Sequence, residues 1–521
     1  MKCPKSYSFV SCFALVFGLA ALSACALPSQ DAAARKGKID RPSTARDQVP
    51  KERNWQAEGQ AWIAKKAKNK PANVSSRAKN IILFIGDGMG ISTITAARIR
   101  KGQLAGLQGE EAELSFEHFD YTGLVKTYNT DAQVPDSAGT MTAMVTGEKT
   151  RKGLISVGAA VPRQDCAAAR RNELLTIADL VKAEKGRVGI VTTTSLTHAT
   201  PAAVYAHAPE RSWEDDSKLS VRAKKEGCAD IAVQLKEAFA DEAIDLAFGG
   251  GERHFRPKSQ GGRRIDQRDL LGELGGGSTL QTVFDRDALL KLNKLPAIGV
   301  FANSHLPYSA QASQVEDNRA PSLAEMSAKA VALLSTTKNE TGFFLMIEAG
   351  RIDHAHHAGN AFHALEDTLA LDRAVSAVLE LVDHEETLVI VTADHSHVFT
   401  MAGYPPRGNP ILGVAGKDFE GNPYTTLGYA NGRGHAVLPD AKSPDERYNH
   451  EVTPGRKNIS SEQTEEPHYH QEVLVGLASE THGGEDVGIW AIGPSSYLLT
   501  GTMEQHMVFF AMRKALGASK D

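Results

Sequence analysis

The stretch GFFLMIEAGRIDHAHH, residues 342 to 357, joins an apolar run to a dense cluster of carboxylate and imidazole side chains. The apolar run has the length of a buried strand, and the cluster follows directly where that strand would end. Hard oxygen donors and borderline nitrogen donors in one place suit Zn²⁺ or a mixture of Zn²⁺ and Mg²⁺. We therefore predict a metal site, for which a solvated histidine-rich loop is the alternative when the stretch is taken alone.

The same pattern of an apolar run followed by possible ligands recurs elsewhere in the chain. It occurs in NIILFIGDGMG (80 to 90), RVGIVTTTSLTHATPAAVYAH (187 to 207) and LVIVTADHSHVF (388 to 399), and ETHGGEDVGIWAIGP (480 to 494) places a histidine just before a strand. Taken singly, Asp87 could form a turn, Asp394 and His395 could cap a helix, and His482 could be an ordinary histidine. Jointly, these alternatives require too many coincidences.

Buried strands of a mostly parallel sheet are continuous apolar runs, and ligands collect at their carboxyl ends. Strand and helix signals alternate from residue 80 to 400, whereas residues 401 to about 470 are dominated by Gly, Pro, Asn and charge. The sequence therefore predicts an α/β fold with a doubly wound, mostly parallel central sheet flanked by helices. We expect an insertion at about 401–470 and all candidate ligands at one edge of the sheet.

A nucleophile for such a site is suggested by VPDSAGTMTAMVTGEKT, residues 134 to 150. Ser137 precedes a helix-like run, so its hydroxyl would lie at a helix N-terminus, where backbone N–H groups favour an anion such as phosphate. The alternative is that Asp136 or Ser137 is merely a helix cap.

These segments together resemble the alkaline phosphatase family, and more closely its animal-type branch. The resemblance extends over about residues 54 to 500 and is carried, in order, by GDGMG, PDSAGT, THATPAAVYAH, EAGRIDHAHH, TADHSHVF and ETHGGEDV. Each motif alone is weak, but six in the family order are highly specific.

The resemblance implies a role for each matching residue. Asp353, His357 and His482 would bind one zinc ion; Asp87, Asp394 and His395 would bind a second; Asp87, Glu348 and Thr200 would bind magnesium, with His198 nearby and acting through water; Ser137 would be the nucleophile; and Arg211 would clamp the phosphate. From the sequence alone, Arg211 in PERSWEDD would be read as a surface arginine. Histidines at both 198 and 354 match the animal-type pattern.

These residue types fit the chemistry that the resemblance implies, which is hydrolysis of phosphate monoesters through a phosphoserine. A serine hydroxyl is a weak nucleophile, and metal coordination can replace a general base. The planar fork of an arginine grips two phosphate oxygens at once. The alternatives are a phosphodiesterase or sulfatase of the same superfamily, and a non-catalytic lipoprotein that binds phosphate or metal.

One departure from the animal-type pattern concerns calcium. Animal-type enzymes carry an extra calcium site, but Ala302 and Ala320 stand where its carboxylates would be expected. We therefore predict no calcium site in this chain.

The N-terminus resembles that of an exported bacterial lipoprotein. A basic start is followed by an apolar run over 9–24 that is too short to span a bilayer, and then by LSAC. We predict a lipoprotein signal peptide over 1–25 with lipidation at Cys25, a flexible tether over 26–52 and a catalytic domain over 53–515. The protein would be lipid-anchored in the bacterial cell envelope, facing the periplasm or the cell exterior; an ordinary cleaved signal peptide is the alternative.

Two remaining cysteines and the net charge indicate a possible disulfide and the kind of partner to expect. In an oxidising compartment Cys166 and Cys228 suggest a disulfide, although two free thiols are the alternative, and both positions match a disulfide of the animal-type branch. The net charge of −5 over 521 residues argues against a nucleic-acid partner. A homodimer is implied by the resemblance alone.

Overall fold

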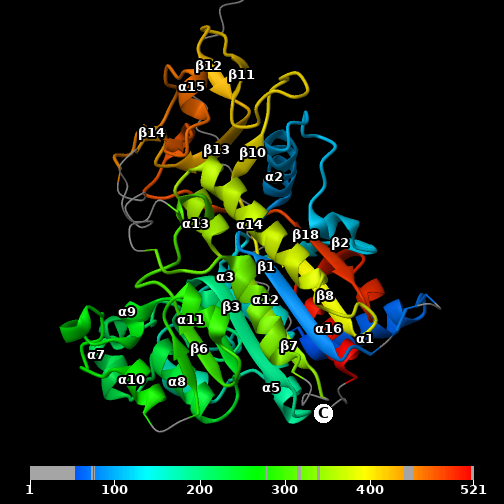
Figure 1. Cartoon of the computed structure of the whole chain (residues 1–521), viewed down its shortest axis with the longest axis vertical. Coiled ribbons are helices and arrows are strands. Elements are labelled where there is room, and N and C mark those ends of the chain that lie inside the picture. Colours follow the sequence, from blue (N-terminus) through cyan, green and yellow to red (C-terminus); the bar gives the residue numbers. More distant parts are fainter. Residues whose placement is uncertain are drawn as a thin grey trace, which may run out of the picture. The chain divides into compact units, whose positions relative to one another are not determined.

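A ten-stranded sheet forms the centre of the fold (Figure 1). Its strands lie in the order β19 (Gly501–Glu504), β2 (Tyr121–Lys126), β18 (Val487–Ile492), β8 (Thr387–Ala393), β1 (Asn80–Gly86), β7 (Phe343–Ala349), β3 (Arg187–Ser195), β4 (Leu246–Gly250), β6 (Ala297–Val300) and β5 (Gln281–Val283). Of these ten strands, β18 alone runs antiparallel to both of its neighbours, β8 and β2. The predicted mostly parallel sheet is confirmed.

The structure is a computed structural model that describes residues 53–71, 74–75, 77–276, 279–313, 318–336, 341–438 and 450–517. The predicted signal peptide, the lipidation site Cys25 and the tether lie outside these residues. Among the described residues, no helix is both long enough and apolar enough to cross a bilayer.

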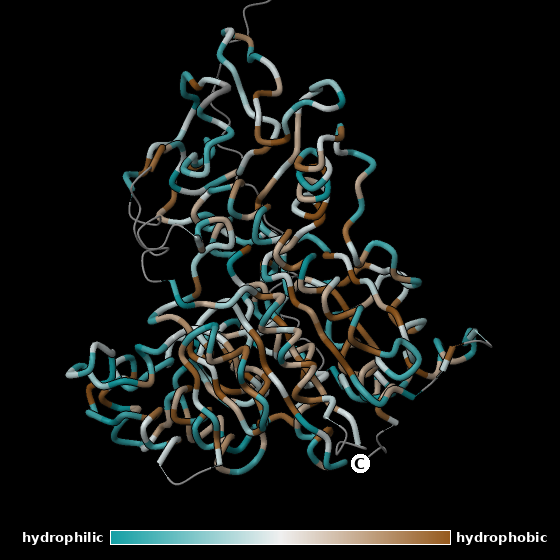
Figure 2. Tube along the Cα trace, in the orientation of Figure 1, coloured by the Kyte–Doolittle hydropathy of each residue, from teal (hydrophilic) through white to brown (hydrophobic). Residues whose placement is uncertain are grey.

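Two groups of helices pack against the central strands β1, β3 and β7. One group consists of α12 (Leu323–Leu334) and α14 (Ala361–Leu379), with α2 (Ile91–Leu104) against α14; the other consists of α5 (Ile177–Ala183) and α16 (Met507–Leu516), with α3 (Ser137–Thr146) against both. Strands β7 and β8 are buried along their whole length, as strands covered on both faces must be. Figure 2 shows the apolar residues concentrated along these strands. The doubly wound arrangement is therefore confirmed.

The remaining helices of the described residues connect and flank these layers. They are α1 (Trp55–Ala67), α4 (Cys166–Arg170), α6 (Ala199–Ala202), α7 (Val221–Lys225), α8 (Ile231–Ala240), α9 (Glu252–Phe255), α10 (Leu270–Gly275), α11 (Arg286–Lys291), α13 (Arg351–His357) and α15 (Ser461–Thr464), with 3₁₀ turns η2 (Ser115–His118), η3 (Asp216–Lys218), η4 (Lys258–Gln260), η5 (Ser309–Gln311) and η7 (Ser496–Leu498).

Between β8 and β18 the chain leaves the main sheet, and its described residues form four small sheets, of which three lie near the top of Figure 1. They are β10 (Phe399–Met401) with β13 (Leu427–Gly432) and β16 (Val473–Gly476), β11 (Val414–Lys417) with β12 (Pro423–Thr425), and β14 (Ala436–Val437) with β15 (Tyr469–His470). At their base, β9 (Ser396–His397) pairs with β17 (His482–Gly483), so His397 lies directly opposite His482. The segment predicted as an insertion thus returns a distant histidine to the end of β8.

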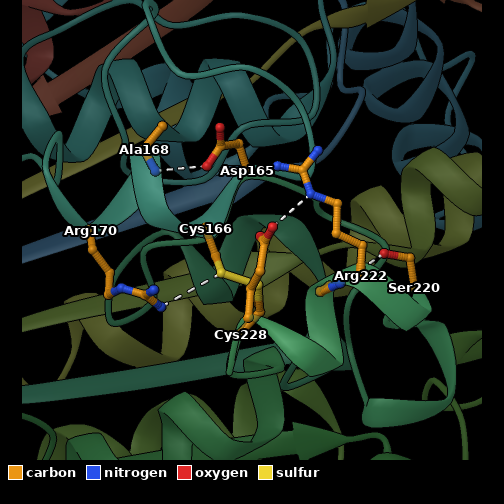
Figure 3. Close-up of a disulfide and its surroundings, with 9 residues drawn as sticks. Asp165, Cys166, Ala168, Arg170, Ser220, Arg222 and Cys228 are labelled. Atoms are coloured by element: carbon orange, nitrogen blue, oxygen red, sulfur yellow. Dashed lines mark hydrogen bonds and ion pairs between the residues drawn. A yellow bond between two sulfur atoms is a disulfide. The ribbon is translucent and has the colours of Figure 1, made fainter.

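The predicted disulfide joins Cys166 to Cys228 across 62 residues of chain (Figure 3). Cys166 opens α4 and Cys228 follows α7, and both cysteines are buried against Trp213. The bond closes a loop that also contains Arg211. Closing such a loop reduces the conformational entropy of the unfolded chain.

Candidate active site and metal centre

Three buried carboxylates come from three adjacent strands of the sheet. Asp87 follows β1, Glu348 lies in β7 and Asp394 follows β8, and each residue is 0% exposed. Because these strands are parallel neighbours, their carboxyl ends bring the three side chains together. The predicted convergence of candidate ligands at one edge is present.

The first predicted zinc set, Asp353, His357 and His482, lies together beside this edge. Nε2 of His357 and Nε2 of His482 are 3.0 Å apart, and both lie within 3.4 Å of Asp353 Oδ1. Nδ1 of His357 donates to the Glu480 carbonyl at 2.7 Å, and Nδ1 of His482 donates to the Pro135 carbonyl at 2.8 Å. In neutral rings both Nε2 atoms therefore present lone pairs, which repel unless a metal ion or a proton lies between them.

The second predicted set, Asp87, Asp394 and His395, surrounds Nε2 of His395. This nitrogen lies 3.4 Å from Asp87 Oδ1 and 3.3 Å from Asp394 Oδ2. Ser137 Oγ lies 3.1 Å from the same nitrogen. The candidate nucleophile is thus within hydrogen-bond reach of the second set.

The third predicted set also includes Asp87. Donor atoms of Asp87, His198 and Glu348 lie within 4.8 Å of one another, and Thr200 contributes a buried hydroxyl from α6. Oε2 of Glu348 accepts hydrogen bonds from the hydroxyls of Thr192 and Thr194, and its Oε1 is buried as well. Asp87 therefore belongs to both the second and the third sets.

The electrostatics of these carboxylates favour bound cations. Burial raises the pKa of Asp87 well above its usual range, and the charge of Asp394 raises it further. Burial also raises the pKa of Asp394 to about 6 and that of Glu348 to about 7. Both carboxylate oxygens of Asp87 are buried and accept no hydrogen bond from the described residues. Cations among these groups would stabilise the ionised forms, so the residues present fit a metal centre.

Ser137 is the first residue of α3, as predicted for a helix N-terminus. Asp136 caps the helix by accepting a 3.1 Å hydrogen bond from the Gly139 N–H, and it also accepts a 3.2 Å bond from Arg211. The alternative that Asp136 is a cap is therefore correct, but the cap also orients Arg211 toward the nucleophile. Ser137 and Arg211 line one pocket of about 380 Å³.

His198 connects this arginine to the third set. Arg211 Nη2 donates to His198 Nε2 at 3.3 Å, since a guanidinium cannot accept. The proton of a neutral His198 ring must then be on Nδ1, which is buried and has no partner among the described residues. A protonated nitrogen cannot bind a metal directly. Contact of His198 with a metal ion through water stays a prediction.

Sequence reasoning assigned no role to His397 or Glu480. His397 donates through Nδ1 to Glu480 Oε2 at 2.6 Å and through Nε2 to Asp353 Oδ1 at 2.9 Å. Burial lowers the pKa of His397, but the charge and hydrogen bond of Glu480, with those of Asp353, raise it to about 10. We infer that His397 is an imidazolium that orients Asp353 rather than a metal ligand. Its position two residues after His395, on the same face of an extended segment, was the available signal.

Ala302 and Ala320 are half-buried and pack against the core. The absence of a calcium site stays a prediction.

The comparisons with known proteins point to one family. A sequence model of the family described as "Alkaline phosphatase" matches residues 78–518. A tissue-nonspecific alkaline phosphatase of Gallus gallus is 42% identical over 458 residues, which cover 84% of each chain. The Homo sapiens enzyme of the same type is 41% identical, over 84% of this chain and 83% of its own.

Solved structures agree with the fold. An alkaline phosphatase of Thermus thermophilus has a TM-score of 0.61 and 24% identity, over 86% of this chain and 93% of its own. The alkaline phosphatase of the Antarctic bacterium TAB5 has a TM-score of 0.58 and 22% identity, over 86% of this chain and 100% of its own.

The fold and these relatives define an enzyme of the phosphomonoesterase class. The chain belongs to the alkaline phosphatase family, and the resemblance seen in the sequence is confirmed.

Gly88 lies beside the predicted metal ligands, so a substitution there tests the packing around His397 and Asp353. A Cβ on Gly88, whose φ is +69°, would lie 2.3 Å from His397 Nε2 and 3.3 Å from the Asp353 Cα. We expect Gly88→Ala to displace Asp353 and to lower activity about 100-fold, since a shift of about 1 Å at a catalytic centre has that effect. The measurements are the metal content and the phosphatase rate of the Gly88→Ala variant and of the wild type.

Gly106→Ala is the matched control, because Gly106 has a φ of +80° and no atom within 4 Å of its Cβ position. The control should keep full activity and lose only the stability that a positive φ costs, about 1–2 kcal/mol. Equal activity of the two variants would contradict the proposed packing.

Proposed function

We propose that this chain hydrolyses phosphate monoesters through a covalent intermediate on Ser137 and releases inorganic phosphate. The observation that carries the proposal is the position of Ser137 Oγ, at a helix N-terminus, 3.1 Å from His395 Nε2 and in one pocket with Arg211. Backbone N–H groups at that terminus and the guanidinium of Arg211 would hold the phosphoryl oxygens.

In the first step Ser137 Oγ loses its proton and forms a bond to phosphorus, the ester P–O bond breaks, and the leaving oxygen takes up a proton to depart as the alcohol. In the second step the oxygen of a water molecule forms a bond to phosphorus, the bond to Ser137 Oγ breaks, a proton of the water returns to Ser137 Oγ, and phosphate leaves. Arg211, held by Asp136 and His198, would keep the phosphoryl group in place during both steps. His354 lies on the wall of the same pocket.

The proposed cofactors are two zinc ions and one magnesium ion. Asp353, His357 and His482 would hold one zinc; Asp87, Asp394 and His395 the other; and Asp87, Glu348 and Thr200, with His198 through water, the magnesium. When bound, the metals would lower the pKa of the attacking oxygen and stabilise the leaving oxygen. Oxygen-rich donors in the third set suit magnesium, and imidazoles in the first two suit zinc.

The second candidates are less well supported. A phosphodiesterase or sulfatase would share the fold and the metals, but a serine nucleophile beside Arg211 and a third ligand set favour monoesters. A non-catalytic phosphate- or metal-binding lipoprotein would not require a nucleophile 3.1 Å from a ligand nitrogen.

We further propose that the protein is a homodimer anchored through a lipid on Cys25 in the bacterial cell envelope, facing the periplasm or the exterior. The disulfide supports an oxidising compartment, since such bonds are rare in the cytosol. The homodimer is proposed because a dimer is typical of the alkaline phosphatase family. Mass spectrometry of the mature protein should find acyl chains on an N-terminal Cys25; an unmodified N-terminus elsewhere would remove the anchor.

Ser137→Ala tests the mechanism. We expect more than about a 10³-fold loss of turnover, because the variant has no nucleophile, with unchanged metal content. The measurement is hydrolysis of a chromogenic phosphate monoester beside the matching diester and sulfate, with Zn²⁺ and Mg²⁺ or with chelator.

Ser156→Ala is a control at another buried serine, which hydrogen-bonds the Ala203 carbonyl outside this pocket. It should retain turnover. Undiminished activity of Ser137→Ala would remove this serine from the mechanism, and a preference of the wild type for diester or sulfate would reassign the reaction.

A further inference from the structure

Glu214 lies three residues after Arg211, and the proposed mechanism gives it no role. Its side chain is 21% exposed and does not line the pocket that contains Ser137. The short segment from Arg211 to Glu214 is also held at two other points: the Arg211 N–H donates to the Gly153 carbonyl at 3.0 Å, and Trp213 packs against the disulfide. A displacement of Glu214 would therefore act on the segment that carries the proposed phosphate clamp.

A turn at the end of β3 supplies the hydrogen-bond donors to Glu214. In this turn the His198 N–H donates to the Ser195 carbonyl at 2.9 Å. The hydroxyls of Ser195 and Thr197, the first and third residues of the turn, both donate to Glu214 Oε2 at 2.7 Å. Both residues are 0% exposed, and a buried hydroxyl that loses its acceptor is costly, so the conformation of the turn depends on Glu214.

The same turn carries residues of the proposed site. His198 is its last residue and accepts from Arg211 Nη2 at 3.3 Å, and Thr200 follows two residues later in α6. The contact between Arg211 and His198 is long for a hydrogen bond, whereas both bonds to Glu214 have ordinary O–H···O lengths. Two short bonds to a charged acceptor therefore fix the spacing of the two segments more firmly than the contact between the arginine and the histidine does.

The carboxylate of Glu214 is ionised in this position. Burial raises the pKa of Glu214, but His254 and the two hydroxyl hydrogen bonds lower it to about 2. Nε2 of His254 lies 3.3 Å from Glu214 Oε2, and Nδ1 of the same ring lies 2.7 Å from Asp215 Oδ2. The ring of His254 is thus held between two carboxylates, and Glu214 is a charged acceptor at neutral pH.

We propose that Glu214 is a positioning residue that fixes Arg211 and His198 relative to each other. One carboxylate oxygen joins the segment of the phosphate clamp to the turn that leads into the third ligand set. The inference rests on the proposed phosphomonoesterase function, because it assigns Glu214 to holding Arg211 in place for the phosphoryl group.

A fourth metal site on Glu214, Asp215 and His254 is the competing use of these side chains. Nδ1 of His254 carries a proton when it donates to Asp215, which removes this nitrogen as a ligand. Among the residues that the structure describes, no group of three potential donor atoms within 4.8 Å of one another includes Glu214. The contacts therefore favour a hydrogen-bonded support over a bound ion.

The test measures two quantities on the full-length, metal-loaded enzyme: the affinity for inorganic orthophosphate by calorimetry, and kcat and KM for a chromogenic phosphate monoester. Glu214→Ala should weaken orthophosphate binding and lower kcat/KM, each about 10-fold, because a displaced Arg211 loses about one hydrogen bond to a charged group. Glu214→Gln keeps a carbonyl oxygen that can accept from the two hydroxyls, so it should restore most of both quantities.

Thr197→Val tests the same connection from the side of the turn, since it removes one of the two donor hydroxyls. It should weaken orthophosphate binding less than Glu214→Ala does. In the double variant the two effects should add to less than their sum, because both substitutions break the same hydrogen bond.

Asp372→Ala is the matched control at another buried carboxylate. Asp372 is 3% exposed, accepts a 2.5 Å hydrogen bond from the Ser115 N–H, pairs with Lys101 at 2.8 Å and lies outside the pocket. This variant should lose thermal stability without a change in orthophosphate affinity. A purely structural role of Glu214 would give the same result in Glu214→Ala.

Wild-type orthophosphate affinity in Glu214→Ala would overturn the inference, as would a Glu214→Gln variant no better than Glu214→Ala or fully additive effects in the double variant. If Glu214→Ala does not fold, Thr197→Val decides, and an unchanged orthophosphate affinity in that variant would overturn the inference. If the wild type binds orthophosphate but hydrolyses no monoester, the proposed function fails, and calorimetry alone still decides the role of Glu214.

Discussion

The burial of several carboxylates at the ends of three adjacent strands is the constraint on which the rest of this site depends. Asp87, Glu348 and Asp394 are fully buried, and their raised pKa values show that the ionised forms are unfavourable there without compensation. Bound cations relieve this cost and connect the stability of the sheet edge to the chemistry.

Neighbouring residues fix the orientation of the candidate metal ligands and of Arg211. Backbone carbonyls fix the protonated nitrogens of His357 and His482, so their other nitrogens face Asp353. Pairing of β9 with β17 brings His482 back to the end of β8, although the whole insertion lies between them in sequence. Asp136 and His198 both accept hydrogen bonds from Arg211, so the position of the arginine that we propose as the phosphate clamp depends on the helix cap and on His198.

The central strands and most of the candidate ligands could be predicted from the sequence, because each ligand lies close in sequence to the strand that positions it. Continuous apolar runs marked β1, β7 and β8, and the ligands directly follow or end those runs, so their convergence followed from the parallel fold. Family motifs assigned roles that spacing could not. His397 was missed although its period-2 relation to His395 pointed to it. His305, which lines the same pocket as Ser137 and Arg211, gave no local signal in the sequence, because it lies in an irregular loop and its hydrogen bond to Ser195 joins residues far apart in the chain.

The most direct test of the central claim is thermal unfolding of the purified chain before and after metal removal, with metal content measured in the same samples. We predict three ions per chain and an unfolding temperature that falls on chelation and recovers when Zn²⁺ and Mg²⁺ are restored, since ions that bind the folded state alone stabilise it. A chain that binds no metal, or that unfolds at the same temperature with and without metal, would show that the buried carboxylates are not compensated by bound cations.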